Sequence, residues 1–348
     1  MHPAPLSSVA RVHLVCLAAS PMGKSDQRYC FVVDWFDPAA SLVRKYQLIY
    51  YTADGTIEMY DLKNRRTFLK RCDYPSVSAK DLYKGAVVTI YSRQLTIADY
   101  GDGFTASVFG TAGASVCVKV APPALPSMGR IIDAMSSAGL SVSELRLLSD
   151  GLTLKLTGAD TAAVWGPLAQ SINDSLGAGA VSDLNGDAFA SGLPKTAVAN
   201  ADASSLLLVR PHAVKAGSLG RILDQLLGSG FEVLNASMIQ LTRPNAAEFL
   251  EVYRGVVPEY NDWVEELTSG KVVALQATFV AEPSNTVLKL RELCGAHDPE
   301  VAQHLHASSL RALYGSTKVK NAVHCTDLPE DGALEVDYFF SILGGGSA

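Results

Sequence analysis

One stretch of this chain occurs twice, and that repeat constrains the fold more than any other feature. Laying Gly129 on Gly220 aligns MGRIIDAMSSAGLSVSELRLLS with LGRILDQLLGSGFEVLNASMIQ, 91 residues further on. In each copy apolar residues recur at helical spacing, a glycine follows, and a β-rich run comes next. The pattern predicts a tandem duplication of a strand–helix–strand unit with a layered α/β core.

The repeat divides the chain into regions. Residues 1–27 form an N-terminal segment, residues 111–195 hold the first copy and residues 205–343 hold the second. The small, polar stretch KTAVANADASS at 195–205 marks the boundary between the copies. Before them, residues 28–110 carry short β-rich runs such as YQLIYY, GTIEMYDL and AVVTIYS, separated by turn signals. This region is predicted to be a small antiparallel β domain.

The second copy predicts an α+β sandwich with a mostly antiparallel sheet. Its β-rich runs are SLLLVR, EVLNASMIQL and KVVALQATFV, and helical patterns cover 217–229, 245–268 and 284–294, before a final LEVDYFFSIL. Because two successive helical segments lie between strands, a doubly wound sheet fits less well.

Composition is that of a globular protein. The chain has 348 residues, 48% of them hydrophobic and 18% charged, enough to bury sizeable cores in two or three domains. Its six cysteines include no C-x-x-C pair, which argues against a disulfide framework or a structural zinc site and favours a reducing compartment. No apolar run of roughly 18 residues predicts a membrane-spanning helix, and residues 9–20 match a secretory signal only weakly.

The net charge of −6 conceals an asymmetry. Residues 41–94 carry ten Lys or Arg and five Asp or Glu, a local net of +5, which leaves −11 for the remainder. Such a basic patch attracts an acidic partner. A solvated strand face without a partner is the alternative, and nucleic acid has less support because stacking aromatics are missing. The patch consists of Lys63, Arg65, Arg66, Lys70 and Arg71.

His324 has a polar setting, within the run KNAVHCTD. A neutral imidazole can attack a phosphorus centre near pH 7 and leave again, so a fixed histidine suits a transient phosphoryl-carrier site. Side chains that could converge on phosphates lie in the same copy: Arg210, Arg291, Arg311, Lys320 and Asn321. Each arginine taken singly is also compatible with a solvated surface position. No metal site is predicted, because His297, His304 and His306 lack the accompanying ligand spacing.

At these residues the chain resembles a known family. Residues 205–343 resemble a nucleoside diphosphate kinase domain through LLLVRPHAV, SGKVVAL, LRELCG and NAVHCTD, and residues 28–110 resemble the PH-like DM-ten domain through VDWFDPAASLVRKYQLIYYTADGTIEMYDLKNRRTFLKR and SRQLTIADYGD. The order of domains is similar to that of the axonemal, group-two nucleoside diphosphate kinase homologues. The resemblance implies a PH-like β domain followed by two ferredoxin-like α/β sandwich domains, the first of them eroded.

The resemblance also implies roles for individual residues. His324 would be the phosphohistidine nucleophile and Glu335 the carboxylate that orients its ring. Mg²⁺ and ATP or another NTP would be required if the C-terminal domain is active, and otherwise no cofactor. The implied nucleotide-binding residues are Arg210, Tyr260, Arg291, Arg311 and Asn321.

Three departures from the family pattern leave catalysis open. Arg210 replaces a lysine, and a planar guanidinium does not substitute for a compact ammonium without rearrangement. The family's active-site tyrosine falls near Leu250 or Glu251, and Cys325 replaces a glycine. The first copy keeps Lys119 at the lysine position but has no histidine, since none occurs between His13 and His212.

Two functions follow from the resemblance. The first is structural: a microtubule inner protein of the ciliary or flagellar axoneme, with a cytoplasmic pool, that contacts tubulin and neighbouring axonemal proteins through the basic patch and the kinase-like domains. It would be present singly, its two kinase-like domains pairing within the chain, without membrane or nucleic-acid partners. The alternative is an active kinase that transfers the γ-phosphate of ATP to nucleoside diphosphates through phospho-His324.

Overall fold

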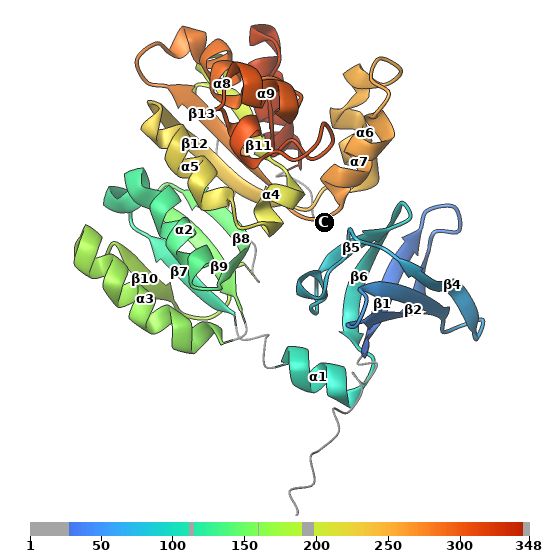
Figure 1. Cartoon of the computed structure of the whole chain (residues 1–348). Helices are drawn as coiled ribbons and strands as arrows, with labels where there is room; N and C mark the ends of the chain where they lie inside the picture. The colour runs from blue at the N-terminus through green and yellow to red at the C-terminus, as the bar shows by residue number, and fades with distance from the viewer. Residues whose placement is uncertain (1–27, 111–114, 159, 190–197, 344–348) are drawn as a thin grey trace, which may run out of the picture.

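The computed structural model describes residues 28–110, 115–158, 160–189 and 198–343 (Figure 1). The N-terminal segment 1–27, including the weak signal match at 9–20, and part of the stretch predicted as the boundary between the copies lie outside these ranges. Among the helices of the described residues, none is long and apolar enough to cross a membrane.

The N-terminal region folds as an antiparallel β domain, as its alternating runs predict. Its six strands lie in the order β4-β3-β2-β1-β6-β5, and apolar side chains such as Phe31, Leu48 and Ile97 fill one face, each at most 1% exposed. The strands are β1 (Arg28–Asp37), β2 (Leu42–Tyr51), β3 (Thr56–Asp61), β4 (Arg66–Asp73), β5 (Val87–Ile90) and β6 (Arg93–Tyr100), followed by α1 (Gly103–Gly110).

The two copies share one eight-stranded sheet, in the order β10-β7-β9-β8-β12-β13-β11-β14. From the β8–β12 junction the first copy runs outward as β8, β9, β7 and β10, and the second copy as β12, β13, β11 and β14. The two halves of the sheet therefore have the same topology, and β10 and β14 form its edges. The expected fold class, a PH-like β domain followed by α/β sandwiches, is confirmed. The first copy comprises β7 (Val116–Val120), α2 (Met128–Ser137), β8 (Ser141–Leu148), β9 (Gly151–Thr157), α3 (Thr161–Leu176) and β10 (Val181–Leu184).

The second copy has the same frame with added helices. Its first elements are β11 (Ser205–Val209), α4 (Pro211–Lys215), α5 (Leu219–Gly228), β12 (Phe231–Ile239), α6 (Arg243–Phe249) and α7 (Tyr260–Thr268). Then follow β13 (Val272–Phe279), α8 (Thr286–Cys294), α9 (Pro299–Leu305), α10 (Leu310–Tyr314), β14 (Val323–Cys325) and α11 (Gly332–Asp337). The final run LEVDYFFSIL is helical in the structure. It starts within α11 and continues as a π turn over Tyr338–Ile342, in which Phe339 and Phe340 are buried.

The copies pack against each other through α2 and α5, the helices of the repeat (Figure 1). A Cβ added at Gly129 would lie 2.3 Å from the backbone nitrogen of Asp224, and one added at Gly220 would lie 2.3 Å from that of Asp133. The two glycines therefore let the helix backbones touch, in a symmetric arrangement. Ion pairs Arg130–Asp224 and Arg221–Asp133 flank the contact at 3.6 and 3.7 Å.

The N-terminal domain contacts the second copy near the start of α6 and the end of α7. Thr89 Oγ1 donates to the carbonyl of Thr268 at 2.6 Å, and Gln94 Nε2 donates to that of Leu241 at 2.6 Å. The backbone N–H of Arg243 donates to Gln94 Oε1 at 3.2 Å. These bonds tie the β5–β6 hairpin to the two helices that the described part of the first copy lacks.

Candidate active site

His324 lies in the middle of the short edge strand β14, where it pairs with Leu208 of β11. Its Nε2 is 3.1 Å from Glu335 Oε2 on α11, and Thr326 Oγ1 donates to the same carboxylate oxygen at 2.9 Å. The histidine is 6% exposed, and the ring of Phe249 meets it edge-on at 5.0 Å. The imidazole is therefore held on two sides, by a carboxylate and by an apolar ring.

The Glu335 contact sets the tautomer of His324. An ionised carboxylate only accepts, so the hydrogen of the neutral ring lies on Nε2 and the lone pair on Nδ1. No hydrogen bond to Nδ1 is found among the described residues. A ring oriented by a carboxylate, with the opposite nitrogen unprotonated, is suited to nucleophilic attack.

Arg311 supports the strand that carries the histidine. From α10, its Nε donates to the carbonyl of Val323 at 3.2 Å and its Nη1 to that of Gly295 at 2.8 Å. Its Nη2 lies 3.6 Å from Cys325 Sγ. The side chain is 7% exposed, so most of its hydrogen-bonding capacity is directed at β14 and its surroundings.

Cys325 occupies the face of β14 opposite His324, because successive side chains of a strand alternate. It packs in the shared apolar core with Cys294, Leu290 and Leu310, and is 1% exposed. A hydrogen bond from Cys294, together with the Arg311 guanidinium, lowers the pKa of the Cys325 thiol. The cysteine that replaces the family's glycine therefore does not crowd the imidazole.

Arg210 is buried at the end of β11, only 1% exposed. Its Nη1 donates to the carbonyl of Val319 at 2.8 Å, its guanidinium lies 5.7 Å from the centre of the Trp263 ring, and its Nε is buried without a partner among the described residues. Burial lowers the pKa of Arg210 to about 10. In this structure the residue supports the loop before His324; direct contact with a phosphate stays a prediction.

The other predicted nucleotide-binding residues lie at different distances from the histidine strand. Arg291 is exposed and donates from Nη1 to the carbonyl of Asp327 at 2.7 Å, just beyond β14. Asn321 is fully buried, donates from Nδ2 to the carbonyl of His297 at 3.1 Å, and keeps Oδ1 without a partner among the described residues. Tyr260 donates instead to the carbonyl of Ala247 at 3.1 Å, which braces α7 against α6.

Two groups at this site had no individual role in the predictions from sequence. Thr326 holds Glu335, and a hydroxyl two residues after the histidine was visible in the sequence as a possible signal. Tyr253 donates to Asp327 Oδ2, and burial raises the pKa of its phenol. Leu250, near the expected tyrosine position, is a core residue at 1% exposure. The phenol of Tyr253 therefore lies beside the histidine segment. In the sequence it is two to three residues after the position at which the family pattern places a tyrosine.

The basic patch lies on β4, an edge strand, and on the turn before it. Lys63, Arg65, Arg66 and Lys70 are exposed. Arg71 differs, because its Nη2 pairs with Asp54 at 2.7 Å and its guanidinium stacks on the Tyr51 ring at 3.7 Å. Four of the five predicted cations thus face solvent without an ion pair among the described residues, and Arg71 is held within the domain.

No group of three or more His, Cys, Asp or Glu side chains in the described ranges could hold a metal ion. Mg²⁺ commonly binds proteins through one or two carboxylates together with substrate phosphates, so a dedicated cage is not required for it. An ion of this kind would be held mainly by the phosphates of a bound nucleotide.

Two different family models match the N-terminal domain and the second copy. Residues 203–343 match the family described as nucleoside diphosphate kinase, and residues 23–111 match the nucleoside diphosphate kinase 7 N-terminal PH domain. Nucleoside diphosphate kinase homolog 7 of Rattus norvegicus is 36% identical, over 93% of this chain and 95% of its own length. The Mus musculus homolog is also 36% identical, over 95% and 97%.

A shorter relative matches a smaller part of the chain. Nucleoside diphosphate kinase of Aquifex aeolicus is 37% identical over 40% of this chain and 94% of its own length. A nucleoside diphosphate kinase domain implies dependence on nucleotide and Mg²⁺ if it is active. From the N-terminal domain, the kinase domain and the near-complete coverage together, the chain belongs to the nucleoside diphosphate kinase family, as a homologue of the nucleoside diphosphate kinase homolog 7 type.

Proposed function

We propose that the second copy is a nucleoside diphosphate kinase that carries a phosphoryl group on His324. The observation that supports this most is the His324–Glu335–Thr326 arrangement, which fixes the ring and leaves Nδ1 as the unprotonated nitrogen. Keeping a carboxylate and an imidazole in a largely buried site costs desolvation free energy, so the arrangement is not expected in a domain that serves only as a spacer.

The reaction would have two balanced halves. Nδ1 of His324 attacks the γ-phosphorus of ATP, the bond from phosphorus to the bridging oxygen breaks, and ADP leaves with the bond electrons. A terminal oxygen of a second nucleoside diphosphate then attacks the phosphorus and the N–P bond breaks, which regenerates the neutral ring. Glu335 accepts from Nε2 throughout and stabilises the positive charge that develops on the imidazole.

Residues around β14 would hold the substrate. Arg291 is exposed beside the strand and can reach phosphates. Asn321 is fully buried, so its unpartnered Oδ1 would accept from a ribose hydroxyl only after the residues that cover it move. Mg²⁺ on the phosphates would neutralise their charge during transfer. The guanidinium groups of Arg210 and Arg311 are buried, so they would add positive charge to the site without direct contact with the phosphates.

The experiment is labelling with γ-labelled ATP and Mg²⁺. An acid-labile, base-stable label is expected on the chain, discharged by an added nucleoside diphosphate and absent in His324→Asn. His306→Asn, at an exposed histidine outside the site, is the matched control and should label normally. Failure of the unmodified chain to label at all would overturn the proposal.

We also propose a structural role in the ciliary or flagellar axoneme, as a microtubule inner protein that contacts tubulin and neighbouring axonemal proteins. The observation that favours it is the exposed basic face of the patch, which suits an acidic surface such as that of tubulin. A single chain would then occupy each site, with a cytoplasmic pool, since the two copies already bury their α2 and α5 faces against each other.

Charge reversal tests this role separately from catalysis. Lys63→Glu, Arg66→Glu and Lys70→Glu together are expected to weaken co-sedimentation with microtubules at physiological salt and to leave phosphorylation of His324 unchanged. The control is Lys289→Glu, a half-buried lysine of the second copy that pairs with Glu292. Undiminished co-sedimentation of the triple variant would exclude the patch as the contact.

A further inference from the structure

Ala322, two residues before His324, has an unusual backbone. Its φ is 70°, in the left-handed region that residues other than glycine rarely adopt. The N–H of Val323 donates to the carbonyl of Asn321 at 2.9 Å across it, which makes Ala322 the central residue of a tight turn. A strained turn persists only where its surroundings hold it in place.

Two groups at the start of α4 hold this turn. The carbonyl of Ala322 accepts from the N–H of Arg210 at 2.9 Å, and the N–H of Ala322 donates to Nε2 of His212 at 3.2 Å. The first contact is between backbones and does not depend on the side chain of Arg210. The second depends entirely on the imidazole of His212.

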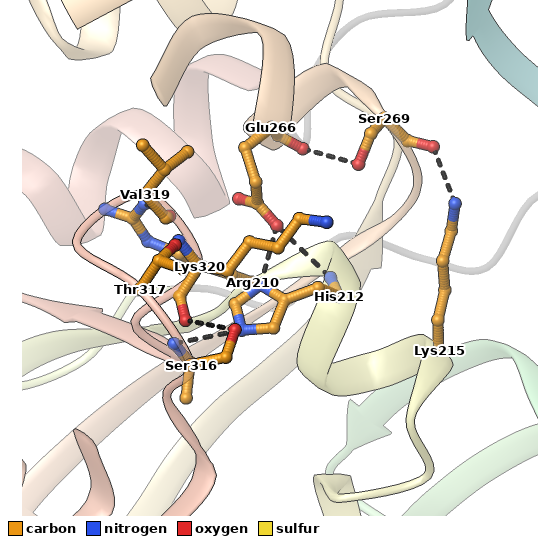
Figure 2. A network of polar contacts seen from close by, with 10 residues as sticks. Arg210, His212, Lys215, Glu266, Ser269, Ser316, Thr317, Val319 and Lys320 are labelled. Atoms are coloured by element: carbon orange, nitrogen blue, oxygen red, sulfur yellow. Dashed lines mark hydrogen bonds and ion pairs between the residues drawn. The ribbon is translucent and has the colours of Figure 1, made fainter. Parts of the chain in front are cut away.

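Glu266 orients that imidazole from α7. Its Oε1 is 2.8 Å from Nδ1 of His212 and 3.2 Å from the backbone nitrogen of the same residue, as the dashed lines in Figure 2 mark. The Glu266 side chain is 4% exposed and that of His212 is 17% exposed. This buried carboxylate accepts both hydrogens and leaves the ring little freedom to rotate.

The hydrogen bonds determine which nitrogen is protonated. A peptide N–H can only donate, so Nε2 of His212 must be the acceptor, and the hydrogen of the neutral ring lies on Nδ1, facing Glu266. The described residues thus include two imidazole–carboxylate pairs. In the His324–Glu335 pair the free nitrogen is available to substrate, and in the His212–Glu266 pair it receives a backbone hydrogen bond.

We propose that His212, oriented by Glu266, is a positioning residue that holds the Ala322 turn and thereby sets the place of the nucleophile His324. The proposal rests on the phosphohistidine function proposed above. The turn also fixes Asn321, whose buried amide donates to the carbonyl of His297. Loss of the His212 acceptor releases the strained peptide between the two functional side chains.

Two substitutions at position 212 distinguish loss of the hydrogen bond to Ala322 from loss of side-chain volume. Gln at position 212 can place its amide oxygen near the position of Nε2 and so accept from Ala322. Asn is one methylene shorter, so it can reach Glu266 but not the turn. His212→Asn is expected to slow phosphorylation of His324 in single-turnover experiments about tenfold, and His212→Gln to restore most of that rate. The two variants should unfold at similar temperatures.

Nuclear magnetic resonance gives readouts that do not require activity. In the unmodified full chain, the nitrogen shifts of His212 should show Nε2 without a hydrogen. The amide hydrogen of Ala322 should exchange slowly, become faster in His212→Asn, and regain protection in His212→Gln. These measurements test the hydrogen bond between His212 and Ala322 even if ATP leaves no label on His324. In that case the proposed function is rejected, and the hydrogen bond is judged from the resonance data alone.

A hydrogen on Nε2 of His212 would overturn the inference without any variant. So would unchanged Ala322 exchange and phosphorylation rate in His212→Asn. Equal slowing of phosphorylation in both variants, with Ala322 protection retained in each, would assign their effect to lost packing and would also reject the positioning role.

Discussion

The two copies share a frame and differ in what they bury. In each, a central pair of strands, an outer edge strand and the helix of the repeat occupy corresponding places around the β8–β12 junction. The buried polar side chains of the first copy are Thr153 and Thr161, among the residues described. The second copy buries several that can do chemistry: Arg210, Glu266, Arg311, Asn321, His324 and Thr326. The frame does not need such groups, so their retention marks the copy that keeps a site.

The strand and the lysine of the first copy that correspond to the candidate site differ from those of the second copy. β10 takes the place of β14 but reads VSDL and contains no histidine. Lys119, which stands at the family's lysine position, pairs with Asp150, and Lys155 pairs with Asp187. The first copy also lacks counterparts of α6 and α7, since β8 leads directly to β9. The copies share one apolar core, whose packing does not require the candidate site residues present in only one of them.

The largest expected effect concerns the nucleophile. His324→Asn should lower phosphotransfer about 10³-fold or more, because no other group described at the site offers an equivalent nucleophile. Adding Leu184→His to that variant places a histidine on β10 and should restore nothing, because no oriented carboxylate and no α6–α7 pair accompany it. Phosphate found by mass spectrometry on the histidine introduced at position 184 would show that the first copy still has a working site.

The next effect concerns the contact between α2 and α5 that joins the two copies. Gly220→Ala should lower the free energy of unfolding by about 1–3 kcal/mol, because the new methyl group meets the backbone of α2. Gly228→Ala in the same helix is the matched control, since nothing lies within 4 Å of its added carbon. Urea denaturation measures both. If the two substitutions cost the same, the close contact between copies is not what holds them.

A smaller effect is expected at Glu335. Glu335→Gln removes the negative charge that orients His324 and should lower the phosphorylation rate about tenfold, with less effect on the binding of nucleotide. Single-turnover rates and equilibrium binding of ADP distinguish these quantities. A large loss of affinity with an unchanged rate would contradict the orienting role.

The smallest effect concerns the exposed ion pairs between the copies. Asp224→Asn and Asp133→Asn should each change the free energy of unfolding by less than about 1 kcal/mol, because exposed pairs are screened by solvent. The difference should shrink further at a salt concentration of about 0.5 M. Denaturation curves at low and high salt measure it, and a change that persists in salt would point to a packing role for these carboxylates.

Local patterns predicted much of this molecule because the information lies close together in the chain. Helical spacing located α2, α5 and α8 within a few residues, and alternation located the strands of the N-terminal sheet. β14 escaped prediction because three residues are too few to show a period and the strand exists only through pairing with β11. The sequence pattern of the final LEVDYFFSIL leaves its element unassigned, because its aromatic residues suit a strand, whereas in the structure they are buried against β11 and α7 as part of a helix.

The candidate site divides in the same way. His324 and Glu335 were named from the resemblance, and their contact is present in the structure. The roles of Arg210 and Arg311 could not be read from sequence, because whether a guanidinium faces a substrate or a carbonyl depends on the surrounding backbone. His212 carried no local signal either, since its partners Ala322 and Glu266 are 110 and 54 residues away.

The amino-acid sequence shows that the chain is duplicated, that a β domain precedes the duplication, and that histidines occur in the second copy and not in the first. Those features depend on residue identity and short-range spacing, which a linear chain records directly. The packing of the folded chain determines which buried cations support the backbone, on which side of β14 Cys325 lies, and that the strained Ala322 turn accepts support from a histidine at the start of α4. These depend on contacts between segments far apart in the chain, where burial and geometry set the free energy of each polar group.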